Sequence, residues 1–499
     1  MGTLISNATI VAMSAEKGAE PFVGDILISN GRIAAMGTAL DSPADATVIK
    51  AGRKLVMPGL VNAHTHSSEM FLRGRYERLP LELWLLYAYP LLRGEPVSKR
   101  IIYLRSMLLA IESLRGGVTT VVDHFFDPPT HDLDRLAMAV QAYDEIGIRA
   151  TVASAVMNIH PLDALPFARE VVPHELQQKL AFGPRISPAA YIDYCRSAVG
   201  AFQGRSSRIG FMVAPSAPQR CSRDLLIACK DFARSAGIPY HTHVLETKTQ
   251  AVTGQLIYGR SLIAYMHELG LLDAGTTLAH GVWVNDTDID RLGAAGCSVA
   301  HNAVSNLKLG SGVAPVRRLI DAGVNVALGS DGACANDTVR MFDVMRVAGL
   351  LHGAMGTEPD KWLAAADILR MATLNGAKSA RLESVTGSLE VGKAADLIVL
   401  DLDTLPFTPT NKIANHIVYA ENGGSIHLVM VGGKIVLQDG HLQTIDEQDI
   451  LAEIRDLIPN YLKSHGELED ANRVFHEPFA EIHRRALASE LRFDRFVPG

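Results

Sequence analysis

The sequence is poor in cysteine and in long apolar runs, and it has no excess of basic residues. Its five cysteines form no C-x-x-C pair, and their odd number argues against a disulfide framework, so we expect a reducing, cytoplasmic compartment. No uninterrupted apolar run reaches the roughly 18 residues of a membrane span. The net charge of -7 offers no basic field to nucleic acid. Neither a membrane nor a nucleic acid is therefore an expected partner.

The chain does have the length and composition of a folded enzyme. It has 499 residues, of which 48% are hydrophobic and 20% charged, with 42 glycines and only 6% aromatic residues. These values are typical of a globular α/β protein that is rich in tight turns. The length allows a barrel of about 250 residues with additions at its ends.

Eight strand-like apolar segments alternate with helical patterns in the middle of the chain. This spacing predicts parallel strands joined by crossover helices, and hence a (β/α)8 barrel of the TIM type. The expected strands are Leu60–Ala63, Thr119–Phe125, Ala150–Val156, Gly210–Pro215, Pro239–Val244, Thr276–Gly281, Ser298–His301 and Asn325–Gly329, and helices such as Lys99–Leu114, Leu133–Ile146, Ser222–Ala236 and Asp286–Ala295 separate them.

Short strands separated by glycines occupy the two flanks of this region. Asn30-Gly31 between two alternating segments predicts a hairpin. We expect residues 1–57 and 385–444 to build one small β-sandwich domain together, and residues 58–384 to form the barrel. Residues 445–499 have a charged, helical pattern and are expected to pack on the outside of the barrel as a C-terminal extension.

The sequence His64-Thr65-His66 follows the apolar run Leu55–Ala63, which has the character of a buried strand. Residues two apart on a strand point to the same face, so both imidazoles can reach one ion. Three other predicted strands also end in reactive groups, namely His241, His243 and Glu246 on the fifth, His280 on the sixth and Asp331 on the eighth. Active sites lie at this end of such barrels, so the pattern predicts a metal site there. It leaves open which of His241 and His243 binds the metal.

Several motifs resemble the amidohydrolase superfamily, in particular its cytosine-deaminase-like and triazine-hydrolase branch. The similarity extends over nearly the whole chain, in Pro58–His66, Leu72–Gly74, Trp84, Gly117–Thr120, His243-x-x-Glu246, His280, Ser305–Leu309, Ser330–Gly332, Asn375–Ala377 and Gly387–Asp396.

The resemblance implies that His64, His66, His243 and Asp331 bind one divalent metal. Three neutral imidazoles and a carboxylate suit Zn²⁺, and Fe²⁺ is an alternative. Dinuclear relatives bridge two metals with a carboxylated lysine, and the matching segment Phe211–Pro218 has no lysine. The H-x-E…P-C-x-x-C signature of the other zinc deaminases is also absent.

The resemblance also implies a reaction, in which Glu246, His280 and Asp331 are the catalytic residues. A metal-bound hydroxide would attack a ring carbon of an aromatic N-heterocycle and displace an amino or substituted amino group, while Asp331 takes a proton, Glu246 donates one to the ring and His280 orients the reacting centre. Alternatives are dechlorination of a triazine, ring-opening of a cyclic amide, deamination of a nucleoside of the adenosine or S-adenosylhomocysteine type, and a barrel that only binds.

Departures from the nucleoside deaminases of this branch indicate a smaller substrate. Ser216 occupies the position of a substrate-contacting histidine, and Tyr89–Arg93 lacks the glutamate that grips the ribose in those relatives. An s-triazine, a pyrimidine or a purine base is therefore expected. Trp84 is equally compatible with a core position, and by analogy we expect a homodimer or higher homo-oligomer. The expected substrate contacts are Trp84, Phe125, Ser216, Gln219 and Asn306, with Phe126 as the alternative to Phe125.

Overall fold

The structure, a computed structural model, describes residues 2–127, 130–180, 185–204, 206–356 and 358–496. Its centre is a barrel of parallel strands, hydrogen-bonded as two sheets in the orders β6-β7-β8-β9 and β10-β11-β12-β13. The predicted barrel is confirmed, and only β9 is much shorter than its predicted range. The strands are β6 (Leu60–Thr65), β7 (Val118–Phe125), β8 (Arg149–Ser154), β9 (Ile209–Phe211), β10 (Tyr240–Val244), β11 (Thr276–His280), β12 (Ser298–His301) and β13 (Asn325–Leu328).

Backbone hydrogen bonds join these two sheets into a closed ring. On one side, Val213 N donates to Pro239 O at 3.0 Å and His241 N donates to Val213 O at 2.9 Å. On the other side, Asp331 N donates to His64 O at 3.0 Å. Closing the barrel therefore also fixes the main chain at three of the residues expected near the metal.

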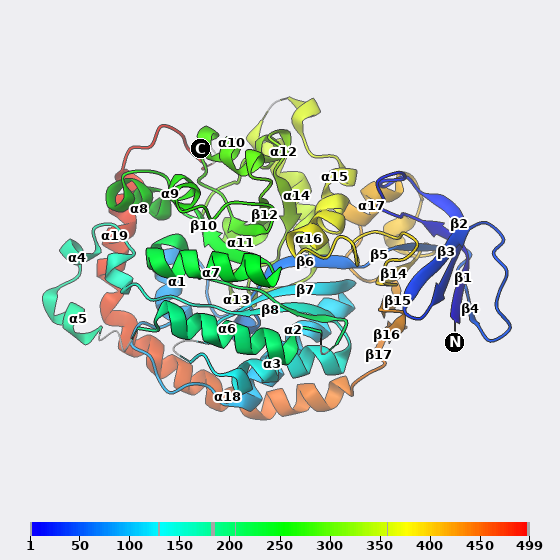
Figure 1. Ribbon diagram of the computed structural model, residues 1–499, viewed down its shortest axis with the longest axis horizontal. Helices are drawn as coiled ribbons and strands as arrows, with labels where there is room; N and C mark the ends of the chain where they lie inside the picture. Colours follow the sequence, from blue (N-terminus) through cyan, green and yellow to red (C-terminus); the bar gives the residue numbers. More distant parts are fainter. Residues whose placement is uncertain (1, 128–129, 181–184, 205, 357, 497–499) are drawn as a thin grey trace.

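Helices surround the barrel on its outer face (Figure 1). Serine and aspartate side chains cap several of them, as Ser222 does by accepting a hydrogen bond from Leu225 N. The helices are α1 (Leu81–Ala88), α2 (Lys99–Arg115), α3 (Leu133–Ile146), α4 (Ala168–Val171), α5 (His174–Lys179), α6 (Pro188–Phe202), α7 (Arg223–Ala236), α8 (Lys248–Tyr258), α9 (Leu262–Glu268), α10 (Asp286–Ala294), α11 (Ala303–Lys308), α12 (Val316–Asp321), α13 (Ala333–Asn336), α14 (Met341–Met355), α15 (Ala365–Met371), α16 (Leu374–Ser379) and α17 (Ile413–Tyr419), with short 3-10 turns at η1 (Ser67–Leu72) and η3 (Pro218–Arg220).

Strands from both flanks of the barrel form one nine-stranded sheet beside it (Figure 1). β14 pairs with β5, which brings the two flanks together, and β5 is followed directly by the first barrel strand. The predicted hairpin lies at Asn30 and Gly31, whose φ angles are 50° and 76°. The domain boundaries proposed above stay a prediction. The strands are β1 (Gly2–Ile10), β2 (Phe22–Ser29), β3 (Arg32–Gly37), β4 (Thr47–Lys50), β5 (Lys54–Pro58), β14 (Leu397–Asp401), β15 (Ile426–Val431), β16 (Lys434–Gln438) and β17 (His441–Leu442).

Two helices at the C-terminal side, α18 (Glu447–Asn472) and α19 (His476–Ala488), run along the outside of the molecule (Figure 1). They cover α1, where Phe475 and Phe479 pack against Leu83 and Leu86. The helix that carries Trp84 is thus held between the barrel and the end of the chain.

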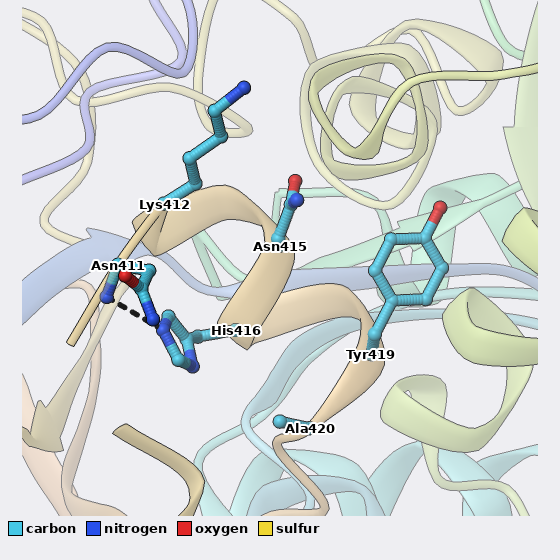
Figure 2. Close-up of a pocket in the computed structure, with 6 residues that line it drawn as sticks. All are labelled: Asn411, Lys412, Asn415, His416, Tyr419 and Ala420. Carbon is cyan, nitrogen blue, oxygen red and sulfur yellow. Dashed lines mark hydrogen bonds between the residues drawn. The ribbon is translucent and has the colours of Figure 1, made fainter. Parts of the chain in front are cut away.

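A surface hollow of about 480 Å³ lies on α17, lined by Asn411, Lys412, Asn415, His416, Tyr419 and Ala420 (Figure 2). None of these six side chains was predicted to take part in the site. Among the described residues, no helix combines the length and the apolar character needed to cross a membrane.

Candidate metal centre and active site

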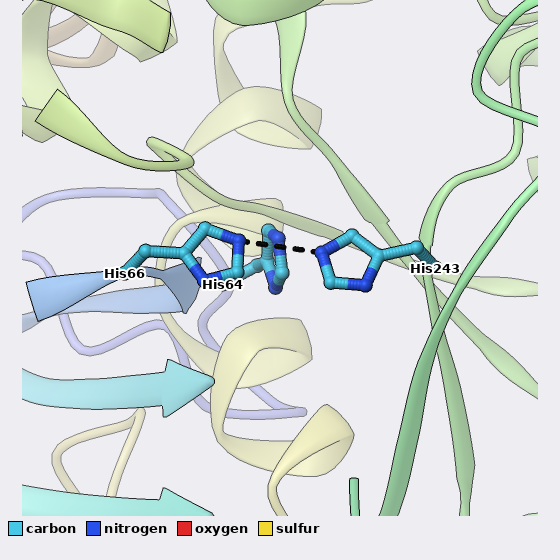
Figure 3. A group of neighbouring side chains, drawn as sticks. All are labelled: His64, His66 and His243. Carbon is cyan, nitrogen blue, oxygen red and sulfur yellow. Dashed lines mark hydrogen bonds between the residues drawn. The ribbon is translucent and has the colours of Figure 1, made fainter. Parts of the chain in front are cut away.

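Two barrel strands bring four histidines together. His64 and His66 lie on and just after β6, and His241 and His243 lie on β10. Alternation along each strand directs both members of a pair to the inside of the barrel. The rings of His66 and His243 stack with their centroids 5.3 Å apart. The ring of His64 lies beside both of them, with its centroid 4.8 Å from each (Figure 3).

Hydrogen bonds determine which nitrogen of each ring is available. His66 Nδ1 lies 2.8 Å from His124 O, and His243 Nδ1 lies 2.7 Å from Ser216 O, so each Nδ1 carries the proton and donates it. This leaves the Nε2 lone pairs free, and the two Nε2 atoms are 3.3 Å apart. They therefore converge on one point.

In His64, too, a hydrogen bond to Nδ1 leaves Nε2 available, and the partner here is another histidine. Its Nδ1 lies 3.0 Å from His241 Nε2, and its own Nε2 is buried with no hydrogen-bond partner among the described residues. His241 is therefore the hydrogen-bond partner of His64, whereas His243 belongs with His64 and His66 to a group whose nitrogen atoms could hold a metal ion. Burial lowers the pKa of His64 and of His243 well below the usual value, which keeps both in the neutral form that binds metals.

Asp331 completes the cluster from the end of β13. Its Oδ1 lies 3.5 Å from His64 Nε2 and 3.4 Å from His66 Nε2. Against the effect of burial, the nearby His280 and His66 hold the pKa of Asp331 below its usual value, so the carboxylate is ionised. Its φ of 61° is a strained conformation for a residue other than glycine, which the surrounding hydrogen bonds maintain.

These four residues fit a divalent metal ion. Three Nε2 atoms and one carboxylate oxygen are a donor set that Zn²⁺ prefers, and each imidazole is oriented by a partner on its other nitrogen. The unpartnered, fully buried Nε2 of His64 is the observation that makes a bound cation the natural completion of the cluster.

Glu246 and His280 lie next to this cluster. His280 Nε2 is 3.7 Å from Glu246 Oε2 and 3.9 Å from Asp331 Oδ2. Asn306 Oδ1 lies 2.9 Å from His280 Nδ1 and accepts a hydrogen bond from it, so His280 Nε2 is left to face the two carboxylates. Burial raises the pKa of Glu246 to about 7, although His280 acts in the opposite direction. Glu246 is therefore able to donate a proton near neutral pH.

The expected substrate contacts are placed in different surroundings. Trp84 is buried beside Tyr89, and its Nε1 has no partner among the described residues. Ser216 and Gln219 are buried near the end of the fourth barrel strand. Asn306 contacts His280, as described above. For these four residues a substrate contact stays a prediction.

The structure contradicts the expected pocket position of Phe125. This residue shares a face of β7 with Asp123, whose carboxylate accepts a hydrogen bond from Tyr143 of α3 at 2.7 Å. Its ring consequently packs in the layer between the barrel and the helices. Phe126 instead contacts Tyr89, with ring centroids 4.5 Å apart.

Two buried side chains near the proposed metal ligands, His124 and Glu69, do not belong to the predicted site. His124 faces the barrel interior 4.6 Å from the ring of His243, and both of its nitrogens lack partners among the described residues. Glu69 is buried in the turn η1 after His66, where it accepts hydrogen bonds from Tyr89 Oη at 2.6 Å and from Cys334 Sγ at 3.0 Å. An acid three residues after the second histidine was the only signal of this cluster.

Comparisons with known proteins agree with this geometry. The model of the amidohydrolase family matches residues 55–436. A 5'-deoxyadenosine deaminase from Methanosarcina mazei is 34% identical over 452 residues, which are 90% of this chain and 96% of that protein. The chain belongs to the amidohydrolase family. The resemblance inferred from its motifs is thus confirmed, and the protein is a hydrolase of carbon–nitrogen bonds with a divalent metal.

Other known proteins are similar to this chain over most of their length. A 5-methylthioadenosine/S-adenosylhomocysteine deaminase from Pyrococcus furiosus is 34% identical, covering 86% of this chain and 94% of that protein. An adenosine deaminase from Xanthomonas campestris, solved with bound zinc, superposes with a TM-score of 0.80 at 27% identity, covering 93% and 98% of the two chains. An atrazine chlorohydrolase from Arthrobacter aurescens, solved with zinc, gives 0.82 at 25%, covering 92% and 100%.

Proposed function

We propose that this hydrolase removes an amino group from an aromatic N-heterocycle in a site with one Zn²⁺ ion. The observation that carries the proposal is Glu246, a buried carboxyl with a pKa raised to about 7 that lies beside His280 and the metal-binding cluster. Loss of ammonia requires protons at the ring and at the leaving group, whereas loss of a halide does not need the second. A buried proton donor therefore favours deamination.

The metal would be held by His64, His66, His243 and Asp331. When bound, a zinc ion in such a site lowers the pKa of water to about 7 and polarises the group under attack. Because the donor set fits zinc, and because two similar structures were solved with zinc, Zn²⁺ is preferred to Fe²⁺. Metal analysis of the purified protein tests this choice.

The reaction adds one water molecule to the ring carbon and releases ammonia. Asp331, ionised beside the three imidazoles, accepts a proton from the attacking water. Glu246 protonates the ring nitrogen, which becomes more basic as the carbon turns tetrahedral, and the leaving amine takes the proton that Asp331 accepted from the water. As ammonia departs and the ring carbonyl forms, the hydroxyl proton returns to Glu246. His280, held by Asn306, presents Nε2 to the reacting centre and orients it.

A nucleoside substrate is the second candidate, and the names of the relatives favour it. Those relatives act on 5'-modified adenosines, and they match most of this chain. The sequence departures at Ser216 and in Tyr89–Arg93 favour a smaller ring. Dechlorination and ring-opening remain the other outcomes, and they yield chloride or a ring-opened acid in place of ammonia.

The test is ammonia release by the metal-replete protein from aminopurines, aminopyrimidines, amino-s-triazines and 5'-deoxyadenosine, with and without a chelator. Ammonia that disappears with chelator supports the proposal. Chloride or a ring-opened acid as the only product, with metal bound, would contradict it.

Two further expectations belong to the same proposal. We propose a homodimer or higher homo-oligomer in a reducing cytoplasm. All five cysteines are buried free thiols, which supports the choice of compartment. Light scattering of the purified protein measures its mass directly, and a monomer at micromolar concentration would contradict the first expectation.

A further inference from the structure

The last part of the chain that the structure describes, residues 491–496, follows α19 and lies against two loops at the carboxyl end of the barrel. One loop, residues 281–284, directly follows β11, and the other, residues 309–313, follows α11. Active sites of this fold are built from loops at that end of the barrel. Phe496 contacts Trp283 of the first loop, with ring centroids 5.1 Å apart. The end of the chain therefore lies beside the loops that leave the catalytic strands.

Arg495 is the buried residue of this segment, and both loops contact it. Its Nε donates to Val282 O at 3.1 Å, and its Nη2 donates to Val284 O at 2.6 Å. Its own carbonyl accepts a hydrogen bond from Val313 N at 2.8 Å. This close approach requires Gly312, whose φ is 105°, because a Cβ there would lie 2.7 Å from Arg495 O. A buried guanidinium is stable only when its donors find acceptors, and here main-chain carbonyls of the first loop supply them.

A series of hydrogen bonds leads from the loop that Arg495 holds to the side chain of His280. Trp283 Nε1 donates to Ser311 O at 2.7 Å, which joins the two loops. Ser311 N donates to Asn306 O at 2.8 Å, and Asn306 Oδ1 accepts from His280 Nδ1 at 2.9 Å. The position of the amide that orients His280 thus depends on both loops.

The main chain of His280 also needs the support of the first loop. Its φ is 74°, a conformation in which residues other than glycine persist only when their surroundings impose it. The loop begins at the next residue and is anchored on the neighbouring strand end, where Trp283 N donates to Leu245 O at 2.8 Å. Arg495 binds the carbonyls on either side of Trp283, and it therefore fixes the loop where the strained turn must be held.

We propose that Arg495 is a positioning residue for His280 and acts through residues 281–284. The inference rests on the proposed function, because it takes His280 as a catalytic group. Arg495 itself does not touch the substrate. It keeps His280 Nε2 in place beside Glu246, where the structure has it 3.7 Å from Oε2. Since a displacement of about 1 Å can slow a reaction by about 100-fold, loss of Arg495 should reduce turnover far more than substrate binding.

The first test removes the two donated hydrogen bonds. Arg495→Met should lower kcat by about 10- to 100-fold and change KM by less than about threefold, with metal content unchanged. Arg495→Lys can still reach one carbonyl and should restore part of kcat. Arg492→Met makes the same chemical change at an exposed residue of the same segment, and as the control it should change neither value. An unchanged kcat in Arg495→Met, or a loss confined to KM, would overturn the inference.

A second variant tests the connection between the loops without touching Arg495. Trp283→Phe keeps an aromatic ring and removes the hydrogen bond to Ser311, so kcat should fall by about 10-fold with little change in KM. All rates are expressed per metal-loaded protein and measured well below the Tm of each variant, which separates positioning from loss of folded protein. If Arg495→Met does not fold, full kcat in both Arg495→Lys and Trp283→Phe would overturn the inference.

Hydrogen exchange separates this inference from the proposed function, because it needs no reaction. In Arg495→Met the amides of residues 281–284 and 309–313 should exchange at least about 10-fold faster than in the unsubstituted protein, and those of β6 should not. Faster exchange together with a reduced kcat for chloride release or ring-opening, and no ammonia from any substrate, would refute the aminohydrolase and keep the positioning role. Unchanged exchange in both loops would overturn the positioning role and leave the deaminase proposal standing.

Discussion

The proposed metal end of this site, at the histidine cluster, and its proposed substrate end, around Trp84, are built by different means. At the metal end, barrel strands carry the ligands, and backbone carbonyls of His124 and Ser216 orient two of the imidazoles. At the substrate end, Trp84 and Tyr89 belong to a segment that side chains of the C-terminal helices hold in place. Asn472, for example, donates to Leu92 O at 3.1 Å. Main-chain hydrogen bonds thus orient the proposed metal ligands, whereas long-range side-chain contacts position the residues proposed to contact the substrate.

The largest expected effect is at a metal ligand. His66→Ala removes one of three converging Nε2 atoms, so metal content and activity should fall together to background. Metal analysis and ammonia release measure both. His427→Ala, at a partly exposed histidine of β15 that pairs with Asp439, is the matched control and should change neither. Full metal content in His66→Ala would remove this residue from the ligand set.

The next effect concerns proton donation alone. Glu246→Gln keeps the shape of the side chain and should keep the metal, while kcat falls by about 100- to 10,000-fold. Since Glu246 acts in its protonated form and its pKa is raised to about 7, kcat of the unsubstituted enzyme should decrease as the pH rises through that value. The residual activity of Glu246→Gln should lack this decrease. Unchanged turnover in Glu246→Gln would refute the role of proton donor, and Glu268→Gln on the exposed face of α9 is the control.

A smaller effect is expected at His241, the hydrogen-bond partner of His64. His241 Nε2 accepts the Nδ1 proton of His64, so His241→Ala should weaken metal binding by about 10- to 100-fold. His241→Gln retains an acceptor and should restore part of the affinity. Competition with a chelator of known affinity measures the difference. If both variants bind metal like the unsubstituted protein, the orientation of His64 does not depend on His241.

The contrast between main-chain and long-range side-chain contacts also explains which site residues could be predicted from the sequence. His64, His66, His243 and Asp331 follow strand-like segments, and alternation along a strand is a local property that places them on one rim. Whether His241 binds metal or holds His64 depends on the distance between β6 and β10, which no local pattern contains.

The substrate end was less predictable for the same reason. Phe125 was expected in the pocket because it lies at the end of a strand. It shares a face of β7 with Asp123, however, and Asp123 contacts Tyr143 of α3, so the ring of Phe125 points away from the barrel interior. The cluster of Glu69, Tyr89 and Cys334 joins residues 265 positions apart at its widest, which no spacing rule reveals.

The smallest expected effect tests how the C-terminal helices hold the substrate end. Glu82 of α1 is buried, and its carboxylate accepts hydrogen bonds from Thr247 Oγ1 at 2.8 Å and from His483 Nδ1 of α19 at 3.0 Å. Glu82→Gln should destabilise the protein at pH 7 by about 2 kcal/mol, because it removes a charge-assisted pair in a buried place. Glu453→Gln, which breaks a surface pair with Arg100, should cost about 0.5 kcal/mol or less.

The pH dependence distinguishes this account from a packing defect. Although burial opposes it, the contact with His483 lowers the pKa of Glu82 below its ordinary value of 4.5. A depressed carboxyl pKa stabilises the fold fully above the unfolded value, and the stabilisation is lost as the pH falls through the folded one. The difference in Tm between the unsubstituted protein and Glu82→Gln should therefore be full at pH 7 and shrink on acidification below about pH 4. A difference that stays constant with pH would assign the loss to packing, and the C-terminal helices would then hold α1 through apolar contacts such as Phe479 with Leu83.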